Sequence, residues 1–242
     1  MVPGRPALDN GYLRIAAMSA RAALQDDPYA AEHHATLAAA LLRMGDYSRA
    51  WNHVDLARGA EFYEDEVAGL EAELWRTAGE PARALALRES WGWTSPDAAQ
   101  QWVELARDAH AAGEPKRAWE ALSQARAWGS TCAVEAVEGL LLDDPETAEV
   151  QLHLARREAD CPEAALLESI LEPDPRQRAV VLAVERSRWP WDPELTAALS
   201  RARFEAGDDG CRVLADKYAV RSEHPEVAAL RGRCPSTAPD LR

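Results

Sequence analysis

Residues 99–132 read AQQWVELARDAHAAGEPKRAWEALSQARAWGSTC, and this stretch determines the fold. Apolar residues recur in it at helical spacing on both sides of a Gly-Glu-Pro sequence. They are Trp102, Leu105, Ala106, Ala118, Leu122 and Ala125. Gly113 suits a left-handed helix terminus, and Pro115 suits the first turn of the next helix. The stretch therefore predicts two helices joined by a tight turn.

The same turn recurs at a fixed interval along the chain. Gly45, Gly79 and Gly113 stand 34 residues apart, and each is followed by an alanine at the same distance: Ala50, Ala84 and Ala118. A unit of this length cannot bury its apolar face alone, so it must stack on copies of itself. The sequence predicts an all-α solenoid with units at 31–64, 65–98 and 99–132.

The repeat is irregular in the second half. Gly113 and Gly207 are 94 residues apart, which is eight short of three full periods. Two shortened units whose turns contain proline account for the difference. We predict units at 133–162, 163–192 and 193–226, a half-unit from residue 11, and a closing helix at Pro225–Arg233. The solenoid then covers 11–234, between flexible tails at 1–10 and 235–242.

These positions resemble the tetratricopeptide-repeat (TPR) family, whose unit is a pair of antiparallel helices with small residues at the crossing. The matching residues are Trp102, Leu105, Ala106, Gly113, Ala118 and Ala125 in one unit, and Leu37, Ala38, Gly45, Ala50 and Ala57 in another. The resemblance implies a right-handed superhelix of about six hairpins. It also implies a non-catalytic scaffold whose first helices line a concave groove.

The charge and the apolar content exclude some functions. The formal charge is −14, so the chain should repel phosphate backbones, and we expect no nucleic-acid partner. No apolar run approaches the roughly 18 residues of a membrane helix, and we expect no membrane insertion. Among the 27 basic residues only Lys116 and Lys217 are lysines. That bias is typical of GC-rich bacterial coding, or else it serves recognition of carboxylates by guanidinium groups.

Catalytic and cofactor signatures are missing from the sequence. It contains no Gly-x-Ser-x-Gly elbow, phosphate-binding glycine loop, His-Glu-x-x-His or Cys-x-x-Cys. His33 and His34 are adjacent and would point about 100° apart on a helix, so they are a poor metal pair. We expect no enzyme activity, no cofactor and no metal.

The resemblance selects candidate groove residues on the first helices. The residues expected to contact a protein or peptide partner are Arg43, Glu73, Arg76, Arg107, His110, Arg201 and Phe204. The alternative is that these side chains form ordinary solvated faces. The Lys and Asn positions with which TPR co-chaperones hold a C-terminal carboxylate are occupied here by Ala35, Ala39, Gly69 and Glu73, so a chaperone adaptor is not expected.

The tryptophans allow two interpretations. Trp51 and Trp119 occupy the same place in their units, which indicates packing. Trp91, Trp93, Trp128, Trp189 and Trp191 lie at helix ends or in a turn. They serve either as filler between repeats or as an interface, because one tryptophan removes much apolar area from water.

The four cysteines are placed symmetrically about two turns. Cys132 and Cys161 flank the turn near Pro145, and Cys211 and Cys234 flank residues 222–223. Residues equidistant from the turn of a helical hairpin lie at the same height, so both pairs could form disulfides. The alternative is four buried thiols. Each bridge would be worth roughly 3–4 kcal/mol on the chain-entropy estimate.

Location and pathway depend on those cysteines. The N-terminus lacks the pattern of a secretion signal, which indicates a cytoplasmic chain. Paired cysteines and a removed leader would instead indicate the periplasm or the cell exterior. The predicted function is a protein-binding scaffold. The alternatives are an envelope assembly or export accessory of lipoprotein type and a regulatory module of a larger system.

Overall fold

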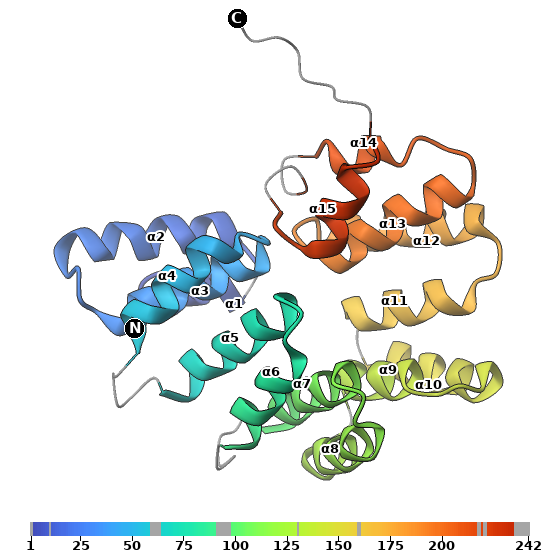
Figure 1. Ribbon diagram of the computed structural model, residues 1–242, viewed down its shortest axis with the longest axis horizontal. Helices are drawn as coiled ribbons and strands as arrows, with labels where there is room; N and C mark the ends of the chain where they lie inside the picture. The colour runs from blue at the N-terminus through green and yellow to red at the C-terminus, as the bar shows by residue number, and fades with distance from the viewer. Residues whose placement is uncertain are drawn as a thin grey trace, which may run out of the picture.

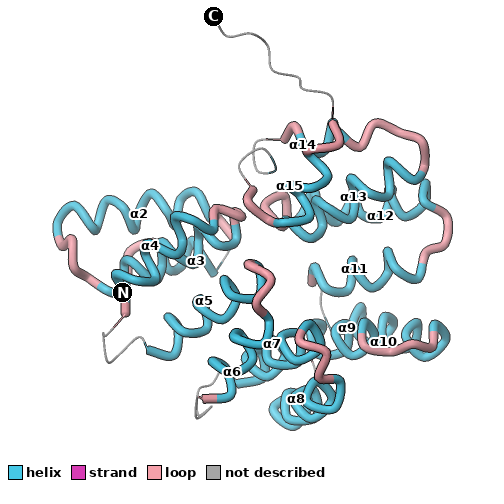
Figure 2. Tube along the Cα trace, in the orientation of Figure 1, coloured by secondary structure: helices cyan, strands magenta, loops and turns pink. Residues whose placement is uncertain are grey.

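The computed structural model describes residues 2–9, 11–58, 64–90, 98–129, 131–158, 161–216, 219 and 222–234. Within these residues the chain forms fifteen helices and no strand, joined by short loops (Figures 1 and 2). The predicted all-α helical-repeat class is therefore confirmed. None of the helices in this part of the chain is long and apolar enough to cross a bilayer.

The helices follow one another in antiparallel pairs. In the first half they are α1 (Arg5–Asp9), α2 (Leu13–Asp26), α3 (Ala31–Arg43), α4 (Tyr47–Ala57), α5 (Glu64–Thr77), α6 (Pro81–Glu89), α7 (Ala98–Ala111) and α8 (Pro115–Trp128). In the second half they are α9 (Cys132–Leu140), α10 (Pro145–Glu158), α11 (Pro162–Leu171), α12 (Pro175–Arg188), α13 (Pro193–Glu205), α14 (Cys211–Leu214) and α15 (Pro225–Arg231). The division into units remains a prediction.

The glycine turns use one backbone arrangement. Gly113 has φ 76°, its N–H bonds the carbonyl of His110 at 2.9 Å, and the N–H of Glu114 bonds the carbonyl of Ala109 at 2.8 Å. These two bonds satisfy carbonyls that the helix end leaves open. Gly11, Gly45, Gly79 and Gly207 have positive φ as well and the same pair of bonds.

Small residues let the paired helices approach closely. Ala38, Ala72 and Ala106 on the first helices, and Ala50, Ala84 and Ala118 on the second helices, are all fully buried. The core is therefore built from alanines at the crossings, with leucines and valines such as Leu37, Leu74 and Val103 filling the space around them.

The two short units predicted at 133–162 and 163–192 are shorter mainly in their first helices. Helices α9 and α11 have 9 and 10 residues, whereas α10 and α12 keep 14 residues each. No glycine turn precedes α10 or α12. Instead, Asp144 accepts a hydrogen bond from the N–H of Thr147, and Asp174 accepts one from Arg176, so each carboxylate satisfies a free N–H of the next helix.

The chain ends differ from the predicted tails. Residues 5–9 of the expected tail at 1–10 form helix α1, and Leu8 is only 2% exposed in the core beside Leu13 and Ala16. The expectation failed because one buried leucine and the Gly11 turn suffice to dock a very short helix. Residues 235–242 lie outside the described residues. The last glycine turn leads only to the four-residue α14, and α15 matches the predicted closing helix apart from its last two residues.

The solenoid bends round so that the turn between α3 and α4 meets the segment before α15 (Figure 1). The N–H of Glu223 bonds the carbonyl of Gly45 at 2.7 Å. Ser48 donates its backbone N–H to the Glu223 carboxylate at 2.6 Å and its hydroxyl at 2.9 Å. Trp191, in the turn before α13, packs against the core of the first helices. We call the contacts between residues 45–48 and 222–224 the closure.

Candidate interaction surface

The structure separates the seven predicted contact residues into two groups. Glu73, Arg76 and Arg107 lie together in an ionic network among the first helices of their pairs. Arg43, His110 and Arg201 are exposed, and Phe204 is half-buried. Whether any of them contacts a partner remains a prediction.

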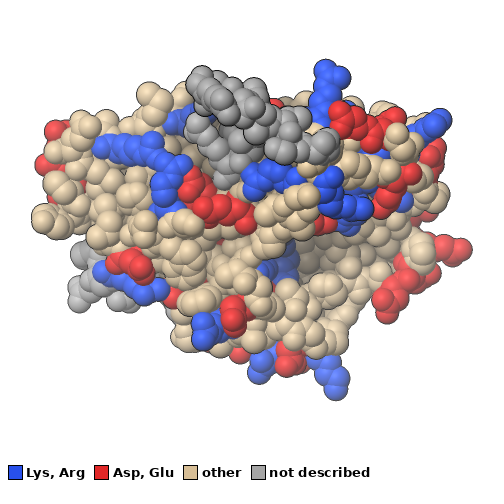
Figure 3. Space-filling view, turned by 45° about the horizontal axis from the view of Figure 1, so that its top comes forward, with Lys and Arg blue, Asp and Glu red and all other residues tan. Residues whose placement is uncertain are grey.

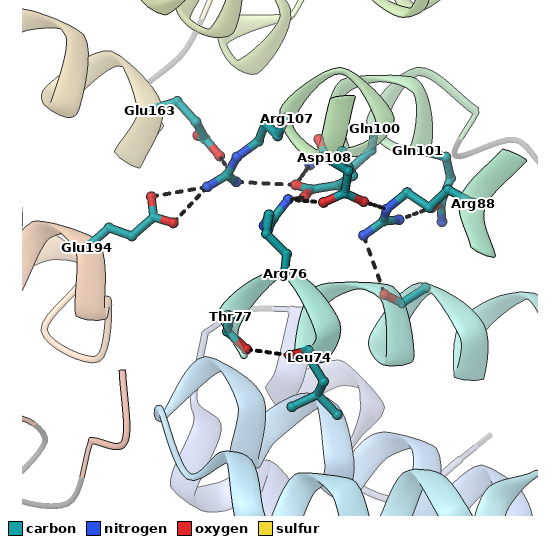
Figure 4. A network of polar contacts seen from close by, with 12 residues as sticks. Leu74, Arg76, Thr77, Arg88, Gln100, Gln101, Arg107, Asp108, Glu163 and Glu194 are labelled. Atoms are coloured by element: carbon teal, nitrogen blue, oxygen red, sulfur yellow. Dashed lines mark hydrogen bonds and ion pairs between the residues drawn. The ribbon is translucent and has the colours of Figure 1, made fainter. Parts of the chain in front are cut away.

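Arg76 and Arg88 converge on one buried carboxylate. Asp108 is 0% exposed and lies between α5, α6 and α7. The Nη1 of Arg76 donates to Asp108 at 3.0 Å and to Glu104 at 2.9 Å. The Nε of Arg88, a residue 3% exposed, donates to the other oxygen of Asp108 (Figure 4). Three helices are thereby tied through charged groups rather than apolar ones.

Arg107 extends the network to the other half of the chain. Its Nη2 donates to both carboxylate oxygens of Glu194 on α13, at 2.9 and 3.0 Å. Its Nη1 lies 3.6 Å from Glu163 on α11 and 3.4 Å from Glu104 (Figure 4). A hydrogen bond between a charged guanidinium and a carboxylate is among the stronger polar contacts in proteins. Arg107 therefore bridges helices that are 87 residues apart in sequence.

The network holds more carboxylates than guanidinium groups. Its acidic members are Glu73, Glu104, Asp108, Glu163, Asp192 and Glu194, and its basic members are Arg76, Arg88 and Arg107. Burial and the neighbouring Glu104 raise the pKa of Glu73. Burial and the neighbouring Glu194 raise the pKa of Asp192 to about 7. The negative charge of this face is thus only partly compensated.

Glu104 has the opposite behaviour within the same network. Burial alone would raise its pKa, but Arg107, Arg76 and Arg88 outweigh burial and hold the pKa well below its usual range. Glu104 is therefore the carboxylate most firmly committed to intramolecular pairing. Glu73 makes no hydrogen bond or ion pair with the described residues, although it lies beside these guanidinium groups.

The remaining predicted residues make local contacts. Arg43 donates to the carbonyl of Leu8 at 3.1 Å, which anchors α1. Arg201 pairs with Glu226 on α15. The guanidinium of Arg233 lies 5.6 Å from the centre of the Phe204 ring. His110 is exposed at the end of α7.

Arg88 and Asp108 also belong to the network, although the repeat pattern does not point to either residue. Arg88 lies on a second helix, where the repeat pattern assigns packing rather than groove lining. The available signal was the run of charged residues on α7, where Glu104, Arg107 and Asp108 fall on neighbouring helical positions. That spacing shows a charged face but does not show that the face is buried.

The tryptophans divide between packing and exposure. Trp51 stacks edge-to-face on Trp75, with ring centres 4.9 Å apart. Trp119 was expected to pack like Trp51 but is 36% exposed. Trp128 is 56% exposed. Trp91 and Trp93 lie outside the described residues.

Both cysteine pairs lie at bonding distance. The sulfur atoms of Cys132 and Cys161 are 2.10 Å apart, and those of Cys211 and Cys234 are 2.15 Å apart. The first bridge links the start of α9 to the residue before α11, and the second links α14 to the residues after α15. This is the pairing that hairpin symmetry predicts.

The face in Figure 3 is hollowed near its centre, and basic side-chain atoms are visible inside the hollow. Acidic and basic side chains are interspersed around it rather than segregated. In the part of the chain that the structure describes, no group of three or more His, Cys, Asp or Glu residues could hold a metal ion.

Solved structures share this architecture. A chain in the crystal structure of the APC/C hetero-tetramer Cut9–Hcn1, a TPR-repeat structure, matches with a TM-score of 0.59 and 12% sequence identity. The match covers 94% of this chain and 47% of that chain, so this chain spans about half the length of the chain it matches. The TPR-like fold is confirmed, and at this identity the likeness shows the fold alone. No protein-family model and no curated protein matches the sequence.

Proposed function

We propose that this chain is a non-catalytic scaffold that binds a protein partner through a segment carrying lysine or arginine. The partner would bind the face formed by the first helices of the pairs and their ionic network, which we call the inner face. The observation that carries the proposal is the uncompensated charge of the ionic network. Its carboxylates outnumber its guanidinium groups, and burial together with neighbouring carboxylates raises the pKa values of Glu73 and Asp192. A cationic side chain placed there would replace the missing positive charge.

The interior arginines are a poor choice for testing this proposal. Arg76 and Arg107 hold the helices together, so a charge reversal at either residue would disturb the fold as well as any groove. Glu73 is more informative, because removing its charge breaks no hydrogen bond or ion pair with the described residues. The exposed Arg43, His110, Arg201 and half-buried Phe204 remain proposed contacts at the edges of this face.

The test compares Glu73→Gln with Glu120→Gln. Glu120 is exposed on α8 and makes no hydrogen bond or ion pair with the described residues, so this variant makes the same charge change on a second helix of a pair. Proteins captured from the source cell by the wild-type chain are identified, and the segment that binds is located by peptide array. We expect Glu73→Gln to weaken that peptide's binding by roughly tenfold and Glu120→Gln to leave it unchanged. Equal binding by all three proteins would reject the inner face.

We propose as a second candidate an assembly or export accessory outside the cytoplasm. The observation that favours it is the pair of disulfides, because such bonds persist in oxidising compartments. Alkylation of the protein in intact source cells, followed by mass spectrometry without reductant, tests the idea. Four alkylated cysteines would count against it.

A further inference from the structure

A basic cleft lies between α12, α13 and α14, apart from the inner-face network. Its volume is ≈ 340 Å³, and three arginines line it, one from each helix: Arg186, Arg203 and Arg212. Asp216 is the acidic residue in its lining. Three guanidinium groups against one carboxylate form a local excess of positive charge on a chain whose formal charge is −14.

Arg186 is already positioned by its neighbours. Its Nε donates to the hydroxyl of Thr196 on α13 at 3.0 Å, and its Nη2 lies 3.3 Å from the Asp216 carboxylate. The side chain is 15% exposed, and the buried Nη2 makes no well-aligned hydrogen bond. The negative charge of Asp216 thus offsets the positive charge of Arg186. The net charge of the cleft is therefore that of Arg203 and Arg212.

Arg203 and Arg212 make no hydrogen bond, ion pair or ring contact with the described residues. The carboxylates nearest to them along the chain are engaged elsewhere. Glu205 accepts a hydrogen bond from Arg178 at 2.7 Å, and Asp209 accepts one from the N–H of Cys211 at 3.0 Å. An acidic chain offers many partners for an arginine, so two uncommitted guanidinium groups in one cleft are informative.

We propose that this cleft binds a small, doubly charged oxyanion, a phosphate-bearing or dicarboxylate molecule. The charge of Arg203 and Arg212 matches a dianion, and guanidinium groups bind carboxylate and phosphate oxygens in bidentate fashion. Leu199 and Val213 supply apolar walls, and the volume lies at the small end of the range for small-molecule sites. The Cys211–Cys234 bridge, next to Arg212, holds α14 against α15 and pre-positions that side of the cleft.

The decisive variants are Arg203→Gln with Arg212→Gln. Neither residue makes a polar contact that the fold needs, so the double variant should remain folded, as far-UV circular dichroism would show. The matched control is Arg157→Gln with Arg176→Gln, which removes two exposed arginines that lie outside the cleft and whose side chains make no hydrogen bond or ion pair with the described residues. Both double variants change the net charge equally.

Inorganic phosphate and succinate are titrated separately into each protein by calorimetry, at fixed ionic strength and at a pH where each is a dianion. We expect saturable binding of at least one probe by the wild type and the control, with affinity lowered roughly tenfold or more in the cleft variant. The probe that binds identifies the class of ligand. Amide NMR shifts in the wild type should concentrate around Leu199, Arg203 and Val213.

Two results would overturn the proposal. One is the absence of saturable binding of either probe to the wild type. The other is an equal loss of affinity in the cleft and control variants, which would show attraction to the overall charge rather than to this cleft. Shifts located away from the cleft in the NMR titration would reject it independently of the variants.

Discussion

Asp108 is the residue that joins Arg76 and Arg88 within the ionic network. It is fully buried and accepts hydrogen bonds from Arg76 and Arg88, which lie on different helices. A buried ion pair often adds little net stability, yet removing one partner leaves a charge stranded away from water. Removing the Asp108 side chain should therefore lower stability more than the ion pairs themselves contribute to it.

We therefore predict that Asp108→Ala lowers the free energy of unfolding by about 3–5 kcal/mol. The control is Asp143→Ala, since Asp143 is exposed before α10 and its side chain makes no hydrogen bond or ion pair with the described residues. That variant should stay within about 0.5 kcal/mol of the wild type. Urea unfolding followed by circular dichroism measures both. Equal effects of the two substitutions would contradict the central role of Asp108.

Asp192 gives the stability a defined pH dependence. Its pKa is about 7 in the folded chain, against an ordinary value of 3.8. Between pH 3.8 and about pH 7, the Asp192 carboxyl is protonated in the folded chain and ionised in the unfolded chain. The resulting stability is fully present below the unfolded pKa and is lost as the pH rises through the folded pKa.

The Asp192→Asn variant should remove that dependence, because an amide does not titrate. An asparagine can still accept the hydrogen bond that Asp192 receives from the N–H of Leu195. We expect the variant to be more stable than the wild type above about pH 7, with the difference shrinking as the pH falls towards 3.8. Chemical unfolding at a series of pH values measures it. A difference that is constant with pH would refute the prediction.

At the scale of the elements, the helix turns were predictable and the ionic network was not. The bonds around Gly45 or Gly113 join residues at most five apart, so a local sequence pattern specifies them. Arg107 contacts Glu194 only because the intervening helices curve enough to bring α7 and α13 together. That curvature depends on the small residues at every crossing and on the shortened α9 and α11, whose combined effect a repeat pattern does not encode.

The glycine turns nevertheless differ in what surrounds them. Gly45 and Gly113 have φ values of 73° and 76°. A Cβ on Gly113 would meet nothing within 4 Å, whereas one on Gly45 would lie 2.5 Å from the hydroxyl of Ser222. Gly45 thus serves both its turn and the closure.

This comparison predicts two unequal costs. Gly113→Ala should cost about 1–2 kcal/mol, the strain of a side chain in the left-handed region. Gly45→Ala should cost about 1 kcal/mol more than Gly113→Ala, because residues 222–224 must move aside. Thermal or urea unfolding of the two variants measures the difference. Identical losses would show that the closure does not press on Gly45.

At the scale of the whole molecule, the two halves are held together by polar contacts of long sequence separation. Arg107 binds Glu194, and Ser48 binds Glu223 across 175 residues. The fold class and the helix pairs follow from the sequence, but the meeting of the ends does not. Arg76 and Arg107, predicted from the sequence as partner contacts in the concave groove, also pair with carboxylates within the chain, which the repeat pattern did not indicate.

We predict that Glu194→Ala with Glu223→Ala opens the solenoid. The expected result is a larger radius of gyration by small-angle X-ray scattering, with helical content unchanged, because only contacts between distant helices are lost. Glu120→Ala with Glu149→Ala is the control, as both glutamates are exposed on second helices of their pairs and their side chains make no hydrogen bond or ion pair with the described residues. A radius equal to that of the control would show that apolar packing, such as that of Trp191, suffices to hold the ends.

The closure also changes how the chain should come apart. In a linear array of repeats each unit is stabilised by its neighbours, so the terminal units, with one neighbour each, fray first. Here the turn between α3 and α4 and the segment before α15 support each other as well as the units beside them, and Trp191 packs on the core of the early helices. Fraying from either end must first break this junction, so amide hydrogens in α3 and α13 should exchange together, as one cooperative unit, rather than progressively from the termini inward.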